Sequence, residues 1–345
     1  MSDNAFNIKA AKAQANPEEY KGVWVFGEQI DGQIQGVVYE LIGKGRELAD
    51  KLGIDLTVVV LGDGMDAACA ELLEYPVDTI IQVDDPALKD YAAEPYAQVV
   101  ADLIARRKPD ILLAGATAIG RSFLARVAVS AQTGLTADCV ALDINADGLL
   151  LQTCPAFGGN IMASILCPKQ RPQMATVRYK VMKAAPKQGR GGKLEKITSD
   201  ASLLRSRTKR LEWLPEITDT VNLADADIIV AGGRGMNNCE GFALLGKLAQ
   251  LLGGAVASTR PAVDEGWIPY STQIGQTGKT VQPKLYIACG ISGAVHHLVG
   301  MASAEQIIVI NKDKTAPIFD VATYGIVGDV FEVVPAMIRE LGGEA

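Results

Sequence analysis

Short apolar runs alternate with longer amphipathic segments through the first half of the chain. The runs are continuous and rich in β-branched residues, which is typical of strands covered on both faces in a parallel sheet. The segments between them carry apolar residues at helical spacing. The pattern predicts strands at residues 23–26, 56–61, 79–83 and 110–115 and helices at residues 35–52, 67–73 and 96–107. Such repeated alternation predicts right-handed βαβ units.

The same alternation returns in the last third of the chain. It predicts strands at residues 227–231, 284–290 and 306–311 and helices at residues 243–252 and 331–341. Residues 139–181 differ, because glycine and proline interrupt short apolar runs there. We expect those runs to be the last strands of a first domain.

A basic segment separates the two regions. Residues 183–210 hold nine basic and two acidic residues, and their centre shows no periodicity. The segment is interpreted as a solvated linker, and the alternative is a docking strip for an acidic partner. We therefore predict an α/β protein of two domains, each a mostly parallel sheet flanked by helices. The domains are expected at residues 1–208 and 209–345, with 183–210 as a basic linker region.

Composition excludes several classes of function. The chain has 33 Lys+Arg and 40 Asp+Glu, a net charge of −7, which argues against nucleic-acid binding. No apolar run approaches the roughly 18 residues that a membrane helix needs, so no membrane insertion is expected. The first residues resemble neither a secretory signal nor a transit peptide, so a cytoplasmic protein is expected. No two of the six cysteines form a C-x-x-C pair, and no metal site is predicted.

Four polar loops rich in glycine or hydroxyl groups accompany the strands of the second region. They are residues 232–235, 258–261, 273–279 and 290–297. Loops at the carboxyl ends of parallel strands hold ligands in α/β folds, so this set predicts a large ligand with phosphates and a polar ring system. The first loop alone fits either a phosphate-binding turn or a tight turn with an exposed Arg234. Asn238 stands where the G-x-G-x-x-G pattern has its third glycine.

Hydrolytic motifs are missing from the sequence. It contains no G-x-S-x-G, no H-E-x-x-H and no G-x-x-x-x-G-K-[ST] phosphate loop, and its only histidines are His296 and His297. A redox cofactor needs only binding groups and electrostatics from the protein. Cations and hydrogen-bond donors without a nucleophile favour that interpretation.

Several motifs together resemble the alpha (large) subunit of electron-transfer flavoproteins, over nearly the whole chain. In the second region they are residues 259–264, 275–279, 289–294, 310–313, 316–319 and 324–329. In the first region they are residues 24–26, 115–117, 155–160 and 172–178. The resemblance implies a Rossmann-like FAD-binding second domain. It also implies a first domain that is a scaffold for a beta subunit, although the loop at 115–121 would also suit a nucleotide.

The resemblance further implies an electron carrier rather than an autonomous enzyme. Its expected partners are the beta subunit and an acyl-CoA dehydrogenase or similar flavoenzyme. Electron bifurcation, with NADH reaching the beta subunit and ferredoxin or flavodoxin as acceptor, is left open. The alternative is a stand-alone nucleotide-binding protein without a redox role. An NAD-dependent dehydrogenase is disfavoured, because the complete G-x-G-x-x-G pattern and a recognisable set of catalytic side chains are missing.

Family motifs imply a role for individual side chains. Arg234 would approach the FAD phosphates, Arg260 would lie against the flavin ring, and Thr277 would donate near flavin N5. Asn311 and Asp329 would hold the adenosine end. The implied cofactor-binding set is Arg234, Thr259, Arg260, Gln273, Ile274, Gly275, Gln276, Thr277, Ser292, Gly293, Ala294, Val295, His296, His297, Asn311 and Asp329.

Two positions depart from the family pattern. Thr259 stands where many members have serine, and His296 stands where many have glutamine. His296 is interpreted as a helix-surface residue, and the alternative is a residue that tunes the flavin potential or its pH dependence.

Overall fold

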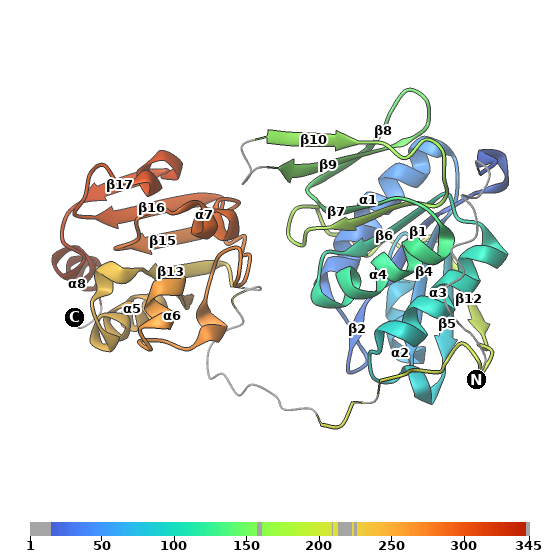
Figure 1. Cartoon of the computed structure of the whole chain (residues 1–345), viewed down its shortest axis with the longest axis horizontal. Helices are drawn as coiled ribbons and strands as arrows, with labels where there is room; N and C mark the ends of the chain where they lie inside the picture. Colours follow the sequence, from blue (N-terminus) through green and yellow to red (C-terminus); the bar gives the residue numbers. More distant parts are fainter. Residues whose placement is uncertain (1–14, 157–160, 209, 213–222, 224–225, 343–345) are drawn as a thin grey trace. The chain divides into compact units, whose positions relative to one another are not determined.

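The chain forms two compact units, Met1–Glu212 and Trp213–Ala345. A computed structural model of the chain describes residues 15–156, 161–208, 210–212, 223 and 226–342 (Figure 1). Part of the glycine-rich segment at 155–160, namely residues 157–160, therefore lies outside the described residues, as does Lys209. Each unit is mixed α/β with a parallel sheet flanked by helices, as the hydrophobic pattern predicts.

Unit 1 is built on a seven-stranded sheet in which all neighbouring strands are parallel. Its spatial order is β12-β5-β4-β1-β6-β11-β7. The strands are β1 (Val23–Gly27), β4 (Leu56–Gly62), β5 (Thr79–Asp84), β6 (Ile111–Gly115), β7 (Leu135–Cys139), β11 (Gln173–Val177) and β12 (Lys193–Ile197). Strands β1, β4, β6 and β11 are buried at every position, because helices cover both faces.

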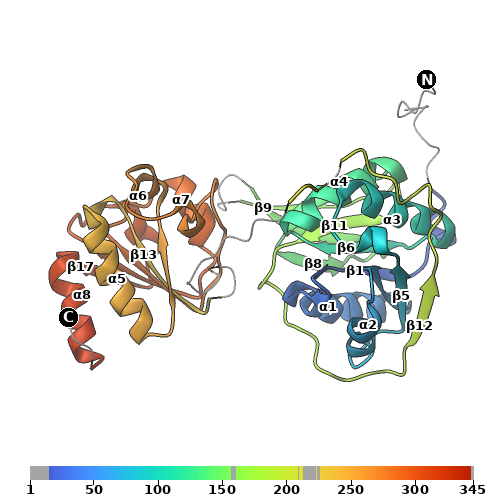
Figure 2. The ribbon, with the colours of Figure 1, turned by 90° about the horizontal axis from the view of Figure 1, so that it is seen from below.

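Two helices cover each face of this sheet. The helices are α1 (Gly36–Leu52), α2 (Asp66–Leu72), α3 (Ala93–Arg107) and α4 (Ala118–Ala131). Figure 2 shows α1 and α2 on one side of the sheet and α3 and α4 on the other. Helix α1 ends at Gly53, whose φ of 65° suits the left-handed position that glycine tolerates best.

Smaller antiparallel pieces complete unit 1. Strands β8 (Ala141–Ile144), β9 (Leu150–Ala156) and β10 (Ile161–Ile165) form a three-stranded sheet, and β2 (Gln29–Ile30) pairs with β3 (Gln33–Ile34). Short 3-10 helices lie at Pro17–Glu19 and Pro86–Leu88.

The interpretation of residues 183–210 as a solvated linker is wrong for its middle part. Residues 193–197 form β12, which pairs with β5 as the edge strand of the large sheet (Figure 2). The basic side chains of this segment also make ion pairs within unit 1. These pairs are Lys187–Glu74, Arg190–Asp50, Lys193–Glu195, Lys196–Asp66, Arg207–Glu94 and Arg210–Asp90. Such internal pairing removes much of the charge that a docking strip would offer.

Unit 2 is a five-stranded parallel sheet in the order β14-β13-β15-β16-β17. Its strands are β13 (Ile228–Gly232), β14 (Ala255–Ser258), β15 (Leu285–Cys289), β16 (Gln306–Asn311) and β17 (Tyr324–Val327). Helices α5 (Cys239–Leu251) and α8 (Val330–Glu340) pack apolar residues against one face. Helix α7 (Val295–Met301) contributes to the core of the other face, and the short α6 (Arg260–Asp264) follows β14.

The remaining elements of unit 2 are 3-10 helices. They lie at Arg234–Met236, Tyr270–Thr272 and Pro317–Val321. Within the described part of both units, no helix is long and apolar enough to cross a membrane.

Candidate functional site

A cavity of about 670 Å³ lies at the carboxyl ends of the first three strands of unit 2. Strand order in that sheet reverses between β13 and β15, because β14 lies on one side of β13 and β15 on the other. Open α/β sheets bind ligands in the crevice at such a switch point. The lining residues are Gly233, Arg234, Thr259, Arg260, Pro261, Gln273, Ile274, Gly275, Gln276, Thr277, Gly290, Ile291, Ser292, Ala294, His296 and His297.

Glycines bring the loops after β13 and β15 into backbone contact. A Cβ atom on Gly233 would lie 2.4 Å from the Gly290 carbonyl oxygen, closer than real Cβ contacts come. The Gly235 amide donates to that same oxygen at 3.1 Å, and Gly290 has a φ of 59°. A larger side chain at Gly233 would force these loops apart.

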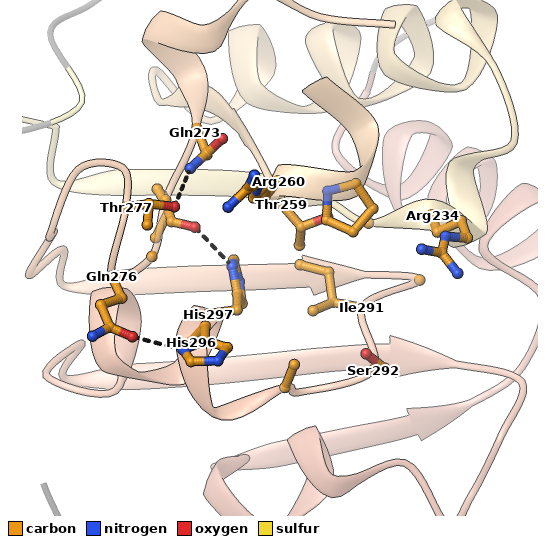
Figure 3. Close-up of a pocket in the computed structure, with 16 residues that line it drawn as sticks. Arg234, Thr259, Arg260, Gln273, Gln276, Thr277, Ile291, Ser292, His296 and His297 are labelled. Atoms are coloured by element: carbon orange, nitrogen blue, oxygen red, sulfur yellow. Dashed lines mark hydrogen bonds between the residues drawn. The ribbon is translucent and has the colours of Figure 1, made fainter. Parts of the chain in front are cut away.

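Two guanidinium groups give the cavity its charge. Arg234 and Arg260 are exposed, and no described residue of the lining carries a carboxylate. Arg260 Nε lies 3.4 Å from Asp264 Oδ2 one turn along α6, and both side chains are more than 60% exposed. Exposed pairs of this kind are weak, so Arg260 is able to bind an anion. Figure 3 shows Arg234 with Ser292 at one end of the cavity, Gln276 at the other, and Arg260 between.

The loop at residues 273–279 is held from both sides. The buried Gln273 Nε2 donates to Thr277 Oγ1 at 3.0 Å, and the Tyr270 hydroxyl donates to the Thr277 carbonyl at 2.7 Å. Because Thr277 Oγ1 accepts from Gln273, its own hydroxyl proton stays available to a ligand. The backbone amide of Gln276 donates to the backbone carbonyl of His296 at 2.7 Å, and this bond joins the loop to α7.

His297 is a buried, neutral imidazole. Its Nδ1 donates to the Ile274 carbonyl at 3.0 Å, so its Nε2 accepts from the Tyr286 hydroxyl at 3.1 Å. Burial lowers the pKa of His297 to about 4, against the weaker raising effect of the Ile274 carbonyl. Both ring nitrogens therefore have protein partners, and a ligand has to reach the ring by other contacts or replace Tyr286.

The neighbouring His296 behaves differently. It is exposed on the first turn of α7, and its Nδ1 donates to Gln276 Oε1 at 2.6 Å (Figure 3). This contact lies at the mouth of the cavity and ties α7 to the loop at residues 273–279. His296 is thus a surface residue that also belongs to the cavity lining.

Four residues of the sequence-derived set lie outside the lining. Gly293 has a φ of 89°, and a Cβ atom there would lie 2.3 Å from the Ile318 amide nitrogen. Val295 is 63% exposed. Asn311 Nδ2 donates to the Ile291 carbonyl at 2.8 Å, and Asp329 caps α8 while pairing with Lys312 at 2.8 Å. The other residues of the set come together around one cavity.

Four lining residues, Gly233, Pro261, Gly290 and Ile291, are absent from the implied residue set, although all four lie in the loops predicted to hold the ligand. Each adjoins a predicted residue, so the neighbouring motifs contained the signal. Tyr286 was missed for another reason: it belongs to a buried strand and reaches the site only through His297.

The lining fits a large, flat, anionic ligand. Ligand cavities of roughly 300–1,000 Å³ are typical for cofactors, and this one combines two cations with hydroxyl and amide donors. Ile274 and Ile291 add a buried apolar surface for a ring system. Guanidinium groups suit phosphates, and glycine loops let backbone amides approach them.

Comparison with known proteins identifies the family. The sequence profile of the electron transfer flavoprotein domain matches residues 23–202, and that of the electron transfer flavoprotein FAD-binding domain matches residues 222–302. The chain belongs to the electron transfer flavoprotein alpha-subunit family. The second match contains every lining residue of the cavity.

Curated relatives resemble the chain over nearly its full length. The electron transfer flavoprotein subunit alpha of Thermoanaerobacterium thermosaccharolyticum is 49% identical over 324 residues, covering 94% of this chain and 98% of that protein. The protein FixB of Clostridium saccharobutylicum is 50% identical over 326 residues, covering 94% and 97%. The acryloyl-CoA reductase electron transfer subunit beta of Anaerotignum propionicum is 42% identical over 353 residues, covering 94% and 96%.

The family match establishes the cofactor and the role of the chain. FAD is the cofactor, and the function is electron transfer. The cavity residues fit FAD in charge, size and donor type, as the preceding geometry shows. Bound FAD supplies the electron-accepting chemistry, and the protein supplies binding, orientation and electrostatics.

Removing three donors at once is expected to release FAD. Gln276, Thr277 and Ser292 line the cavity with exposed polar side chains. Each hydrogen bond contributes about 1 kcal/mol, so the triple alanine variant should bind FAD roughly 100-fold more weakly. Gel filtration followed by flavin absorbance measures the retained FAD. Gln306→Ala, at the amino end of β16, is the control, and a triple variant that keeps its full flavin would contradict the assignment.

Proposed function

We propose that the chain binds FAD in the cavity of unit 2 and passes electrons between a dehydrogenase and a second redox partner. The observation that carries this proposal is Arg260, a cation paired only with the exposed Asp264 and lying beside an apolar floor at a sheet switch point. A cation there favours the anionic reduced forms of a flavin ring. Reduction of the purified complex by a substrate-loaded acyl-CoA dehydrogenase, followed at the flavin absorption band, tests it. Flavin that stays oxidised with every flavoenzyme donor offered would contradict it.

Unit 2 supports a Rossmann-like FAD-binding fold in this proposal. Its first strand, β13, has the second strand, β14, on one side and the third strand, β15, on the other. This strand order is one of those found in doubly wound folds. In that arrangement Arg234 and the loop at residues 290–294 hold the pyrophosphate, while Thr277 and Arg260 face the flavin ring. Asn311 orients the Ile291 carbonyl, and Asp329 is assigned to the adenosine end beyond the cavity.

We also propose that unit 1 is a scaffold for a beta subunit. Strand β10 exposes apolar side chains that a monomer would bury: Ile161 is 54% exposed and Met162 is 59% exposed. Ile165 and Leu166 extend this surface. Large exposed apolar patches mark interaction sites. Residues 172–178 do not contribute, because Gln173–Val177 is the fully buried strand β11.

Charge on the β10 surface is expected to weaken the heterodimer. Ile161→Glu together with Ile165→Glu places two carboxylates in the proposed interface, where desolvation is costly. We expect at least a 100-fold loss of affinity for the beta subunit, measured by sedimentation or gel filtration of the mixed subunits. Val129→Glu, at an exposed apolar position on α4, is the matched control. Heterodimers of undiminished stability would place the interface elsewhere.

The identity of the redox partners is proposed by analogy. The Anaerotignum propionicum relative is described as an electron transfer subunit of acryloyl-CoA reductase, which favours an acyl-CoA dehydrogenase-type flavoenzyme as partner. Bifurcation would need a second FAD in the beta subunit and oxidation of NADH, with ferredoxin or flavodoxin as acceptor. The flavin count per heterodimer separates the two cases: one FAD contradicts bifurcation, and two FAD with NADH oxidation support it.

A cytoplasmic location completes the proposal. All six cysteines are free thiols in the structure. Reducing compartments keep thiols in this state.

A further inference from the structure

A second cavity, of about 380 Å³, lies in unit 1 and shares no lining residue with the cavity of unit 2. It lies where strands β1, β4, β5 and β12 begin, at the opposite end of the sheet from the usual ligand position. Helix α3 ends beside it, and its last residue Arg107 lines the cavity. Figure 2 shows β12 at the edge of this sheet next to β5.

Strand register places four side chains in one row beneath the cavity. Trp24 pairs with Thr57, Thr57 with Thr79, and Thr79 with Lys193, so all four lie on the same face of the sheet. In the next row on that face, Val59 and Ile81 pack against helix α3. Two adjacent hydroxyl groups thus stand between Trp24 and Lys193 at the end of this face.

Three donor groups of the first row, the Trp24 indole N–H and the Thr57 and Thr79 hydroxyls, have no protein acceptor among the described residues. Neither Thr57 nor Thr79 makes a side-chain hydrogen bond, and the Trp24 indole N–H donates to no described residue. Thr57 and Trp24 are nevertheless 8% and 4% exposed. None of these donor atoms belongs to the buried polar atoms without a partner, so each stays accessible and is able to donate to a ligand in the cavity that these residues line.

Cations reach the cavity from three separate segments: Lys21 precedes β1, Arg107 ends α3, and Lys193 begins β12. Within the described part of the chain, Lys21 makes no ion pair. The other two share one carboxylate, since Glu195 lies 2.9 Å from Arg107 Nη2 and 3.2 Å from Lys193 Nζ. Asp55 is the only other acidic residue of the lining, so positive charge is in excess.

We propose that this cavity binds a small tetrahedral oxyanion, either phosphate or a phosphate monoester. Its oxygens accept from the ammonium of Lys21, the Arg107–Lys193 pair and the Thr57 and Thr79 hydroxyls. A phosphate has enough acceptor positions to meet donors on several sides, which a flat carboxylate does not. Glu195 holds Arg107 and Lys193 in place and competes with the anion for them.

Tryptophan fluorescence measures the binding directly. The FAD-loaded complex is titrated with inorganic phosphate, and in parallel with adenosine monophosphate, at constant ionic strength. Trp24 lines the cavity, so we expect a saturable change that Trp24→Phe abolishes. Tighter binding of phosphate identifies a free anion, and tighter binding of the nucleotide identifies a monoester. No saturable change with either probe would overturn the proposal.

Charge variants separate specific binding from general screening. Lys21→Gln should weaken binding about tenfold, while Glu195→Gln should tighten it, because a competing carboxylate is lost. Lys187→Gln is the control. Lys187 belongs to the basic segment 183–210, as Lys193 does, but it pairs with Glu74 and does not line the cavity. Retained FAD and retained heterodimer show that each variant is folded. The Lys21 result decides: this side chain makes no hydrogen bond or ion pair with a described residue, so unchanged affinity in Lys21→Gln would overturn the site.

Discussion

Replacing Arg260 with alanine is expected to lower the reduction potential of the bound FAD by tens of millivolts. Arg260 lines the cavity, and its only ion-pair partner among the described residues is the exposed Asp264. A guanidinium stays protonated at every physiological pH, so it stabilises the extra negative charge of a reduced flavin ring. Its loss should therefore favour the oxidised cofactor.

Screening sets the size of the effect. Two unit charges 4 Å apart interact by about 4 kcal/mol at an effective dielectric of 20. The Arg260 side chain is 64% exposed, so most of that energy is lost to solvent. A remaining effect of about 1 kcal/mol corresponds to about 40 mV for one electron.

Two variants give the experiment its controls. Arg260→Lys keeps the charge but loses the planar fork, so a smaller shift is expected. Lys247→Ala removes a cation from helix α5 that does not line the cavity. Potentials are measured by stepwise reduction with dithionite, after the FAD content of each protein has been checked. An Arg260→Ala protein with full FAD content and an unchanged potential would show that the arginine lies away from the ring.

Strands were predictable wherever apolar runs were continuous, as in β4 and β15. Several elements escaped, and two of them show different reasons. Helix α4 begins at a motif that reads as a loop, because Thr117 and Gly120 are typical of turns. Thr117 is in fact the N-cap of α4, accepting from the Gly120 amide at 2.9 Å. Strand β12 is half-exposed and charged, and only its pairing with β5 defines it as a strand.

The site shows the same limit at the level of single side chains. Loop motifs predicted which residues gather around the cavity, because strand ends fix where loops meet. Hydrogen bonding within the site was not predictable from spacing. His297 bonds to Tyr286, eleven residues earlier on β15, and to the carbonyl of Ile274 on another loop. Only the fold brings those three residues together.

The buried His297 is expected to make unit 2 sensitive to acid. Its pKa is about 4 in the folded protein, below the ordinary value of 6.5, because burial disfavours the imidazolium. The folded state therefore binds its proton only at lower pH than the unfolded chain does. This contribution to stability is complete above pH 6.5 and is lost as the pH falls toward 4. The full loss is about 3 kcal/mol.

Histidine NMR can test this directly, because His296 and His297 are the only imidazoles of the chain. The experiment uses the FAD-loaded complex, in which the beta subunit carries a different isotope label so that its signals are separated from those of this chain. The His297 signal should titrate far below pH 6.5. His296→Gln assigns the two signals without touching the buried ring. His297→Gln keeps an amide donor for Ile274 and an acceptor for Tyr286 but does not titrate. The free energy of unfolding falls for both proteins between pH 7 and pH 4.5. The fall should be 2–3 kcal/mol smaller for this variant than for the parent. A His297 signal that titrates near pH 6.5, with equal acid sensitivity in His297→Gln, would mean that the ring is hydrated and that Tyr286 does not hold it.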